Sequence, residues 1–443
     1  MVTANQARRA LAAACIGNLL EWYDFTVYAL FATYIADCFF PGNDPSAALV
    51  KTFLAFGFGF VARPLGALLI GAYGDAVGRK AALTLTIWLM AAGTLLIAVA
   101  PGHASIGAAA PWLLLFGRLL QGLSAGGEIG SASAFLAESA AAGKRGARAA
   151  WQEASMGMSN ILGALVAFTV TGLLSHQQLQ DWGWRIPFFV GLLIAPAGLL
   201  LRRSLQETAD FENEQLRRRN VRAGAEAEAR SPLVLAFSGH AAALTVGFGL
   251  SILWAVAVYV LNIYTPVYVQ HAFGFSAQQA FAASLIGNVL FVAGCLLAGR
   301  CSDRLGRRAV LAFGAWALLV AVLPLYLWLQ AAPTTGTLIV VQSAFCLMVA
   351  SFVGVAPAAL SDLFPTAIRA TGISVVYNAA FVIFGGFAPA ILTWFTREAH
   401  GSLMAPAGYV MCAAVIGLLT LPFFERRRAA AAALGAVREG VAA

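Results

Sequence analysis

The chain contains 443 residues, of which 60% are hydrophobic and only 11% are charged. Soluble domains usually carry about 25% charged residues, so this composition excludes an ordinary water-exposed surface. The 28 basic and 20 acidic residues leave a net charge of +8, but the basic residues are dispersed between long apolar segments, which favours the lipid bilayer over nucleic acid as a partner.

Twelve apolar segments are long enough to cross about 30 Å of hydrocarbon as helices. Glu21 and Asp24 interrupt the first of them, which argues against a cleaved signal peptide after Arg8 and Arg9. The pattern predicts an all-α integral membrane protein with twelve transmembrane helices, at 10–37, 49–73, 81–100, 111–136, 149–174, 185–202, 235–268, 278–298, 309–330, 337–360, 371–396 and 404–424.

The basic residues predict the orientation of the chain in the membrane. Most of the 28 fall in the tails and the even-numbered loops, which share one side of the membrane. The exceptions are Lys51, Arg185 and Arg397, which fall on the opposite side, and Arg63 and Arg118, which lie inside predicted helices. Because Lys and Arg are enriched in cytoplasmic loops, we expect both termini in the cytoplasm. For a bacterial chain this means a multi-pass protein of the inner membrane.

The longest polar segment divides the chain into two halves. The sequence predicts an N-terminal six-helix bundle at 1–202, a cytoplasmic linker at 203–232, a C-terminal six-helix bundle at 233–428 and a cytoplasmic tail at 429–443. A linker of about 30 residues cannot bury a core of its own, so we expect at most a surface helix there.

An internal repeat relates the two halves. GAYGDAVGRK at 71–80 is repeated as GRCSDRLGRR at 299–308, and the pair Glu138 and Arg145 is repeated as Asp362 and Arg369 at nearly the same offset. Two such bundles, related by an axis along the membrane normal, enclose a cavity at their interface, as in transporters. We predict that these loops form latches that hold one conformation of the protein. The alternative is that they only fix the topology through their positive charge. The predicted latch residues are Gly71, Asp75, Gly78, Arg79, Glu138, Arg145, Gly299, Asp303, Gly306, Arg307, Asp362 and Arg369.

The repeated ten-residue loop resembles the signature of the major facilitator superfamily. More narrowly, GNLLEWYDF (17–25), RPLGALLIGAYGD (63–75), GRLLQGLSAGGEIG (117–130), WGWRIPFF (182–189) and RRSLQET (202–208) are similar to its metabolite:proton symporter family. ATYIADCFFP (32–41) and the 117–130 segment also resemble members that carry citrate and related tricarboxylates. The resemblance implies the major facilitator fold and proton-coupled uptake.

Ionisable residues inside a bilayer are costly and therefore mark candidate functional sites. The Asp, Glu, Lys and Arg residues well inside the predicted helices all belong to the first half, and they are Glu21, Asp24, Arg63, Arg118, Glu128 and Glu153. Some of them, Glu128 and Glu153 above all, could merely pair across helices to lock the bundle. Arg63 is followed by Pro64, so this pair could instead mark a kink.

Two helix faces gather most of these groups. Asn18, Glu21 and Asp24 lie three residues apart on the first helix, and Arg118, Gln121 and Glu128 form a stripe on the fourth. We predict that Asn18, Arg63, Arg118 and Gln121 bind an anionic substrate and that Asp24, Glu21 and Glu128 couple protons. An anion that occupies Arg118 withdraws the partner of a buried acid, so that anion and proton bind together.

The second half offers neutral side chains. We predict that Asn262, Tyr264, Tyr377 and Asn378 contribute hydrogen bonds to the substrate, although buried Asn and Tyr residues more often join two helices. Tyr268 and Asn288 are weaker candidates of the same kind.

Two other function classes compete with a symporter. GLSAG at 122–126 matches the hydrolase pattern around Ser124, but Gly122, Gly126 and Gly130 recur every four residues, which indicates close helix packing. A transporter-like sensor is the other alternative. Six scattered Cys residues without CxxC pairing give no metal site, and no cofactor is implied.

Arg63 and Arg118 suit a carboxylate through bidentate pairing. The expected function is proton-coupled symport of citrate or a related tricarboxylate by alternating access. Alternatives within the same fold are a dicarboxylate such as 2-oxoglutarate, shikimate, or a zwitterionic osmolyte such as betaine. We expect a monomer, since one chain contains both bundles.

Overall fold

The computed structural model describes residues 4–441 apart from 78, 127, 139, 141–142, 204–236, 238, 366–367 and 397–402. Almost the whole predicted linker at 203–232 therefore lies outside the described residues, as does Gly78. Nearly every described residue is helical, in agreement with the predicted all-α class.

The first half contains ten α-helices and a short 3₁₀ turn within its described residues. In chain order these are α1 (Ala4–Leu30), α2 (Ala32–Phe39), α3 (Pro45–Val77), α4 (Arg79–Val99), α5 (His103–Ile106), α6 (Ala109–Ala125), α7 (Glu128–Glu138), α8 (Arg145–Leu173), α9 (His176–Asp181), η1 (Gly183–Arg185) and α10 (Ile186–Arg203).

The second half repeats this architecture, with π-helical turns in two of its long segments. Its described elements are α13 (Ala241–Ala257), η2 (Val258–Tyr264), α14 (Thr265–Phe273), α15 (Ala277–Leu305), α16 (Arg307–Ala331), α17 (Thr335–Val353), α18 (Ala356–Leu363), α19 (Arg369–Ala380), η4 (Phe381–Gly386), α20 (Ala388–Phe395) and α21 (Ala405–Val441).

Each of the twelve predicted spans coincides with one or more of these helices. Eight described segments are long and apolar enough to cross a membrane, and Thr84–Val99 and Gly183–Leu193 are shorter apolar helices. The first span ends at Leu30, because the helix is interrupted at Phe31 before α2 begins. The last one continues to Val441, so that residues 429–441 of the expected tail belong to α21.

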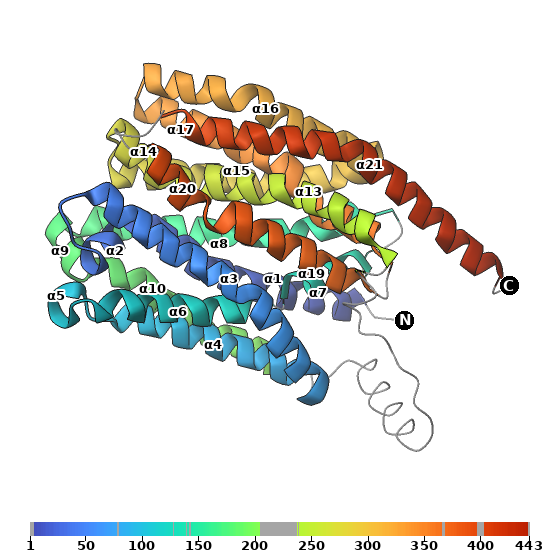
Figure 1. Ribbon diagram of the computed structural model, residues 1–443, viewed down its shortest axis with the longest axis horizontal. Coiled ribbons are helices and arrows are strands. Elements are labelled where there is room, and N and C mark those ends of the chain that lie inside the picture. Colours follow the sequence, from blue (N-terminus) through green and yellow to red (C-terminus); the bar gives the residue numbers. More distant parts are fainter. Residues whose placement is uncertain are drawn as a thin grey trace.

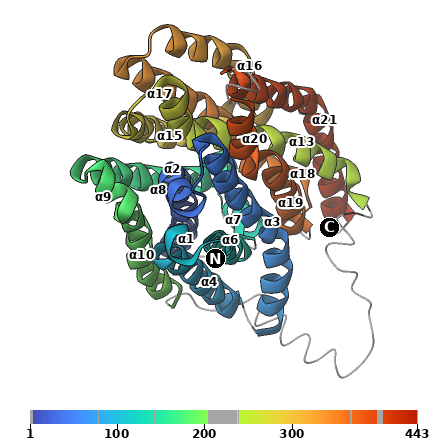
Figure 2. The ribbon, with the colours of Figure 1, turned by 60° about the vertical axis from the view of Figure 1, so that its left-hand side comes forward.

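The helices form two bundles that lie side by side (Figures 1 and 2). In the first bundle, α6 packs on α3 and α4, and α1 packs on α8. In the second bundle, α15 packs on α17, and α21 packs on α13 and α16. The interface between the bundles is made mainly by α8 against α15, with α3 against α20 beside it. Both termini lie at one end of the molecule, which we call the terminal face (Figure 1).

Glycines allow α3 and α6 to approach closely. A Cβ atom added at Gly122 would overlap the carbonyl oxygen of Gly59, and one added at Gly126 would overlap that of Arg63. At Gly130 the neighbours are Ser374 and Ala370 of α19. The predicted packing role of the glycine stripe is therefore confirmed, and it brings Arg63 and Arg118 into adjacent turns of two touching helices.

Candidate functional site

Two arginine side chains are buried at the centre of the first bundle. Arg63 of α3 is 1% exposed and Arg118 of α6 is fully buried. Both contact the ring of Phe25 on α1, with guanidinium carbons 4.7 Å and 4.6 Å from the ring centroid. Phe60 and Trp22 also face Arg63, while Tyr28 and Phe56 face Arg118. Aromatic faces stabilise a desolvated cation.

Two buried acids of α1 accompany these arginines. An oxygen of Glu21 lies 3.5 Å from Arg63 Nη2. Asp24 is connected to Arg118 indirectly: Arg118 donates to Gln121 (2.6 Å), Gln121 donates to Thr94 (2.9 Å), and Thr94 donates to Asp24. Asp24 is 4% exposed and Glu21 is 8% exposed, so both lie away from solvent. The predicted cluster on α1, α3 and α6 therefore exists, joined by Thr94 of α4.

Several polar atoms of this cluster have no hydrogen-bond partner. Arg118 Nε and Nη2, Arg63 Nε and Asp24 Oδ1 are all buried without one. Burying donors of a charged group without acceptors is unfavourable, so such atoms indicate a place for a ligand. The free guanidinium edges are matched in geometry to the oxygen atoms of a carboxylate.

Two other predicted residues of the first half stand apart from this arrangement. Asn18 uses its amide group to donate to the Gln152 carbonyl (2.9 Å) and to Ser155 Oγ (2.8 Å), which ties α1 to α8. Glu128 begins α7, and its side chain lies outside the described residues.

The second bundle brings Tyr259 to the arginines. Tyr259 lies in the π-helical segment η2, is fully buried, and leaves its hydroxyl without a partner. Its ring centroid is 5.3 Å from that of Phe60 and 6.1 Å from that of Trp22, and its hydroxyl lies within electrostatic range of Arg63 and Arg118. No pattern in the sequence distinguishes Tyr259 from the other tyrosines of this segment.

The four predicted residues of the second half have different surroundings. The carbonyl of Asn262 accepts from Cys346 Sγ (3.5 Å), while its amide nitrogen has no partner. Tyr264 accepts a bond from Thr393 (3.1 Å), which joins η2 to α20. Tyr377 stacks on Phe381 with ring centroids 3.7 Å apart and lies within range of the charge on Arg63. Asn378 Oδ1 is buried without a partner.

At the terminal face, one repeated motif connects the two bundles. Asp303 of α15 accepts from the backbone N–H groups of Gly146 (2.7 Å) and Ala147 (2.9 Å) in the first turn of α8. Arg307 binds Asp303 (3.1 Å) and Asp362 (3.1 Å). Arg369 donates to the carbonyl of Ser361 (3.0 Å). We refer to Gly146, Ala147, Asp303, Arg307 and Asp362 as the latch cluster.

The remaining predicted latch residues contribute in other ways. Gly299 lies against the backbone of Gly146, and Gly306 adopts a positive φ of 87° between α15 and α16, a conformation that glycine tolerates best. Arg145 is exposed, so that the backbone of α8 rather than this side chain contacts Asp303. The structure describes the backbone of Gly71, Asp75, Arg79 and Glu138 but not the side chains or their surroundings.

The bundles are also connected at the opposite face. Thr33 Oγ1 lies 3.2 Å from His271 Nε2, and Phe31 faces Phe281 with ring centroids 6.1 Å apart. With contacts at both ends and the arginines buried between them, this conformation holds the cluster closed to solvent.

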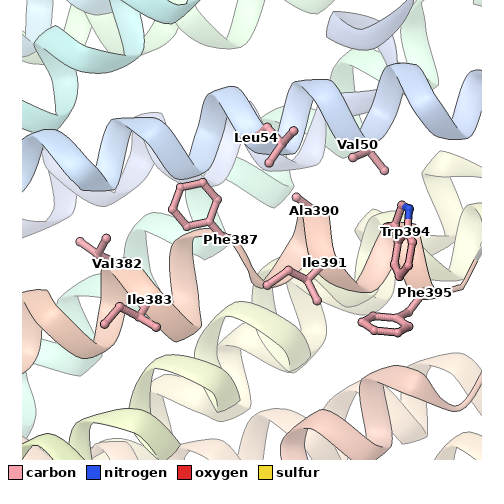
Figure 3. Close-up of a pocket in the computed structure, with 9 residues that line it drawn as sticks. All are labelled: Val50, Leu54, Val382, Ile383, Phe387, Ala390, Ile391, Trp394 and Phe395. Atoms are coloured by element: carbon pink, nitrogen blue, oxygen red, sulfur yellow. The ribbon is translucent and has the colours of Figure 1, made fainter.

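A groove on the outer surface does not belong to this cluster. It has a volume of about 580 Å³ and lies between α3 and the η4–α20 segment (Figure 3). Apolar and aromatic side chains line it, among them Leu54, Ile383 and Trp394, which are exposed. Nothing in this lining could compensate the charge of a carboxylate, so the groove does not suit an anion.

Comparison with known proteins identifies the family. The model of the sugar (and other) transporter family matches residues 10–425. The chain belongs to this transporter family. A citrate-proton symporter of Salmonella typhi is 38% identical over 402 residues, which cover 91% of this transporter and 90% of the relative. A proline/betaine transporter of Escherichia coli is 35% identical, covering 93% and 82%.

Solved structures agree on the fold. The major facilitator proton:xylose symporter XylE, bound to 6-bromo-6-deoxy-D-glucose, superimposes with a TM-score of 0.76 at 18% identity, covering 95% of each chain. This transporter therefore has the major facilitator fold. Its apolar helices and its bacterial relatives indicate a multi-pass protein of the inner membrane, and the matched family and relatives are transporters rather than enzymes. Ser124, the residue of the hydrolase pattern, donates to the carbonyl of Thr86 (2.7 Å) inside the bundle.

Proposed function

We propose that this transporter takes up citrate or a related tricarboxylate together with protons by alternating access. The observation that carries the proposal is the pair of buried arginines with unused donor atoms beside two buried acids. The sequence identity of 38% to a citrate-proton symporter, in an alignment that covers nine-tenths of both chains, supports the same substrate class.

The arrangement favours a multiply charged anion over the zwitterionic osmolytes of the proline/betaine relatives. An aromatic cage could in principle bind a quaternary ammonium group. Here, however, the guanidinium groups of Arg63 and Arg118 already cover the rings of Phe25, Tyr28 and Phe60. Two cations in one site also suit a substrate with two or three carboxylates better than one with a single carboxylate.

Coupling to protons follows from competition for the same cations. A substrate carboxylate at Arg63 displaces Glu21 from its ion pair, and one at Arg118 neutralises the charge nearest to the Gln121–Thr94–Asp24 chain. A buried carboxylate that loses its cation takes up a proton more readily. The substrate and the proton therefore stabilise each other in the closed state and leave together.

The orientation that we propose places the terminal face in the cytoplasm, because the basic residues are concentrated in the tails and in the loops on that side. The latch cluster then closes the cytoplasmic side, and Thr33 and His271 lie at the outer side. We propose the single chain as the transporting unit, since it contains both bundles and the complete arginine cluster.

Substrate identity is tested with the purified protein in proteoliposomes under an inward pH gradient, acidic outside. The panel of solutes is citrate, tricarballylate, 2-oxoglutarate, shikimate and betaine. We expect accumulation of the tricarboxylates, abolished when the gradient is collapsed. Accumulation of betaine without any of the carboxylates would overturn the proposed substrate class.

The proton site is tested with the double variant Glu21→Gln, Asp24→Asn. We expect it to lose accumulation driven by the pH gradient, since neither acid can carry a proton. Asp44→Asn is the control, because Asp44 is exposed and accepts a hydrogen bond from Ala47 N at the start of α3 (2.9 Å), outside the arginine cluster. A double variant that still concentrates the substrate would exclude these acids as the proton site.

A further inference from the structure

A third buried acid, Glu153 of α8, lies outside the arginine cluster. It is 2% exposed, and its Oε2 atom accepts a hydrogen bond of 3.2 Å from the indole N–H of Trp254 on α13. Within the described residues Glu153 forms no ion pair. A carboxylate in this setting is poorly compensated when ionised, because a single neutral donor replaces its hydration.

The groups around Glu153 come mostly from the second bundle. The titratable side chains within range of its charge are Tyr259 of η2, Cys295 of α15 and Tyr377 of α19. From the first bundle, Glu21 and Arg63 act on the same two tyrosines. Tyr259 and Tyr377 are therefore near both Glu153 and the arginine cluster, while no Lys or Arg pairs with Glu153 in the described part of the chain.

The position of Glu153 along the bundle is nearer to the terminal face than the other acids. Asn18 of α1 bonds to the carbonyl of Gln152, next to Glu153, and Glu21 and Asp24 follow Asn18 one and two turns further into the bundle. The three acids are thus arranged in a row along α1 and α8. Glu153 is the one nearest to the terminal face, two turns from the start of α8 at Arg145.

We propose, on the basis of the proposed symport, that Glu153 is the proton-binding site on the exit side of the arginine cluster. It receives the proton that the acids of α1 release when the substrate leaves and these acids regain their arginine partners. When α8 separates from α13 and α15, Glu153 loses Trp254 and meets water, to which its carboxyl group releases the proton. No bond other than the O–H bond changes in this step.

The transport test compares two modes of uptake in Glu153→Gln. Citrate counterflow exchanges substrate without net proton movement, and we expect it to stay near the native rate. Net uptake driven by the pH gradient should fall by about 100-fold, the range typical of a lost acid–base group. The matched control is Glu425→Gln, a Glu to Gln change near the end of the membrane-spanning part of α21, which should leave both modes unchanged. Equal net uptake by Glu153→Gln and the native protein would overturn the proposal.

A second test needs no substrate. Infrared spectra of the protein in lipid, recorded as a function of pH, should contain a protonated-carboxyl band that Glu153→Gln lacks. Trp254→Phe should keep this band and move its midpoint to higher pH, since the ionised form then loses its donor. A band unchanged in both variants would contradict the proposal even if citrate transport is established.

The two tests separate two failures. If the native protein accumulates none of the carboxylates, the proposed substrate is wrong, and the infrared titration still decides whether Glu153 binds a proton. If the native protein accumulates citrate and Glu153→Gln does so equally well, Glu153 is only a helix–helix contact.

Discussion

Arginine and carboxylate side chains divide the chemistry of the buried cluster between them. Guanidinium groups remain charged in proteins, so Arg63 and Arg118 supply fixed positive charge whatever the conformation. The buried acids in the described part of the chain are Glu21 and Asp24 within this cluster and Glu153 outside it, and these groups can change their charge by binding protons. In the proposed mechanism, substrate recognition and proton coupling thus depend on different residue types that act through shared electrostatic contacts.

Arg118→Lys tests how much of recognition depends on the shape of the guanidinium group. Lysine keeps the charge but cannot reproduce both the bond to Gln121 and a bidentate bond to a carboxylate. Losing charge-assisted bonds of about 1.5–3 kcal/mol should raise the citrate dissociation constant about 10- to 100-fold, as measured by calorimetry.

Arg185→Lys is the matched control for that measurement. Arg185 lies over Trp184 and donates to the carbonyl of Ala98 (2.7 Å), away from the buried cluster. We expect its replacement to leave citrate affinity unchanged. Equal loss of affinity in both variants would mean that the effect at Arg118 is structural rather than a loss of recognition.

At the residue level, the structure brings together Glu21, Asp24, Arg63 and Arg118 of the first half, whereas the residues proposed in the second half have separate surroundings. Costly charges in apolar helices point to burial by themselves, so the cluster of Glu21, Asp24, Arg63 and Arg118 could be expected. Thr94 and Tyr259 gave no such signal, because neutral residues are common in membrane helices. Only the packing of α4 and η2 against the cluster reveals them.

Helix geometry contributes to the position of Tyr259, which faces Trp22 and Phe60 of the first bundle. In η2 the N–H group of Thr265 bonds to the carbonyl of Val260, five residues earlier, whereas an α-helix bonds four residues earlier. The additional residue in the turn shifts which side chains face the first bundle. Asn262 and Tyr264, which the sequence suggested as neutral hydrogen-bonding residues of this segment, contact α17 and α20 instead.

Close packing of α3 and α6 gives a prediction about stability. Gly126→Leu places a side chain against the backbone of Arg63, so the helices must separate. Overpacking of this kind should lower stability by about 1–3 kcal/mol, and the thermal melting temperature should fall. Gly408→Leu is the control, since nothing lies within 4 Å of a Cβ atom at that glycine. Similar melting temperatures for both variants would contradict the packing argument.

At the scale of the whole molecule, the two bundles touch at both faces, and each face uses different chemistry. The terminal face relies on the charged latch cluster, while the opposite face uses Thr33, His271 and aromatic contacts. Alternating access requires that one set of contacts opens while the other remains. The latch cluster is suited to this role because Asp303 stabilises the N-terminal end of a helix from the other bundle.

Asp303→Ala tests this role, with Cys295 as the reporter. Cys295 of α15 is fully buried and lies within range of Glu153 at the bundle interface. The other five cysteines are first replaced by serine, so that a water-soluble thiol reagent labels only Cys295. Asp303→Ala should then raise the labelling rate about tenfold, which corresponds to the free energy of a lost helix cap. Asp37→Ala changes the opposite face and should not accelerate labelling. Unchanged labelling in Asp303→Ala would show that the latch cluster does not control opening.

The amino-acid sequence by itself determined the membrane location, the twelve helical segments, their two-fold repeat and the charged residues of the first bundle. These features follow from hydropathy, helix length and the cost of burying charge, which are local properties of the chain. Tertiary structure alone decided that Asp24 reaches Arg118 through Thr94 and Gln121, that Tyr259 completes the cluster and that Glu153 meets Trp254. Such pairings depend on how helices distant in sequence pack and on π-helical turns, which no local pattern encodes.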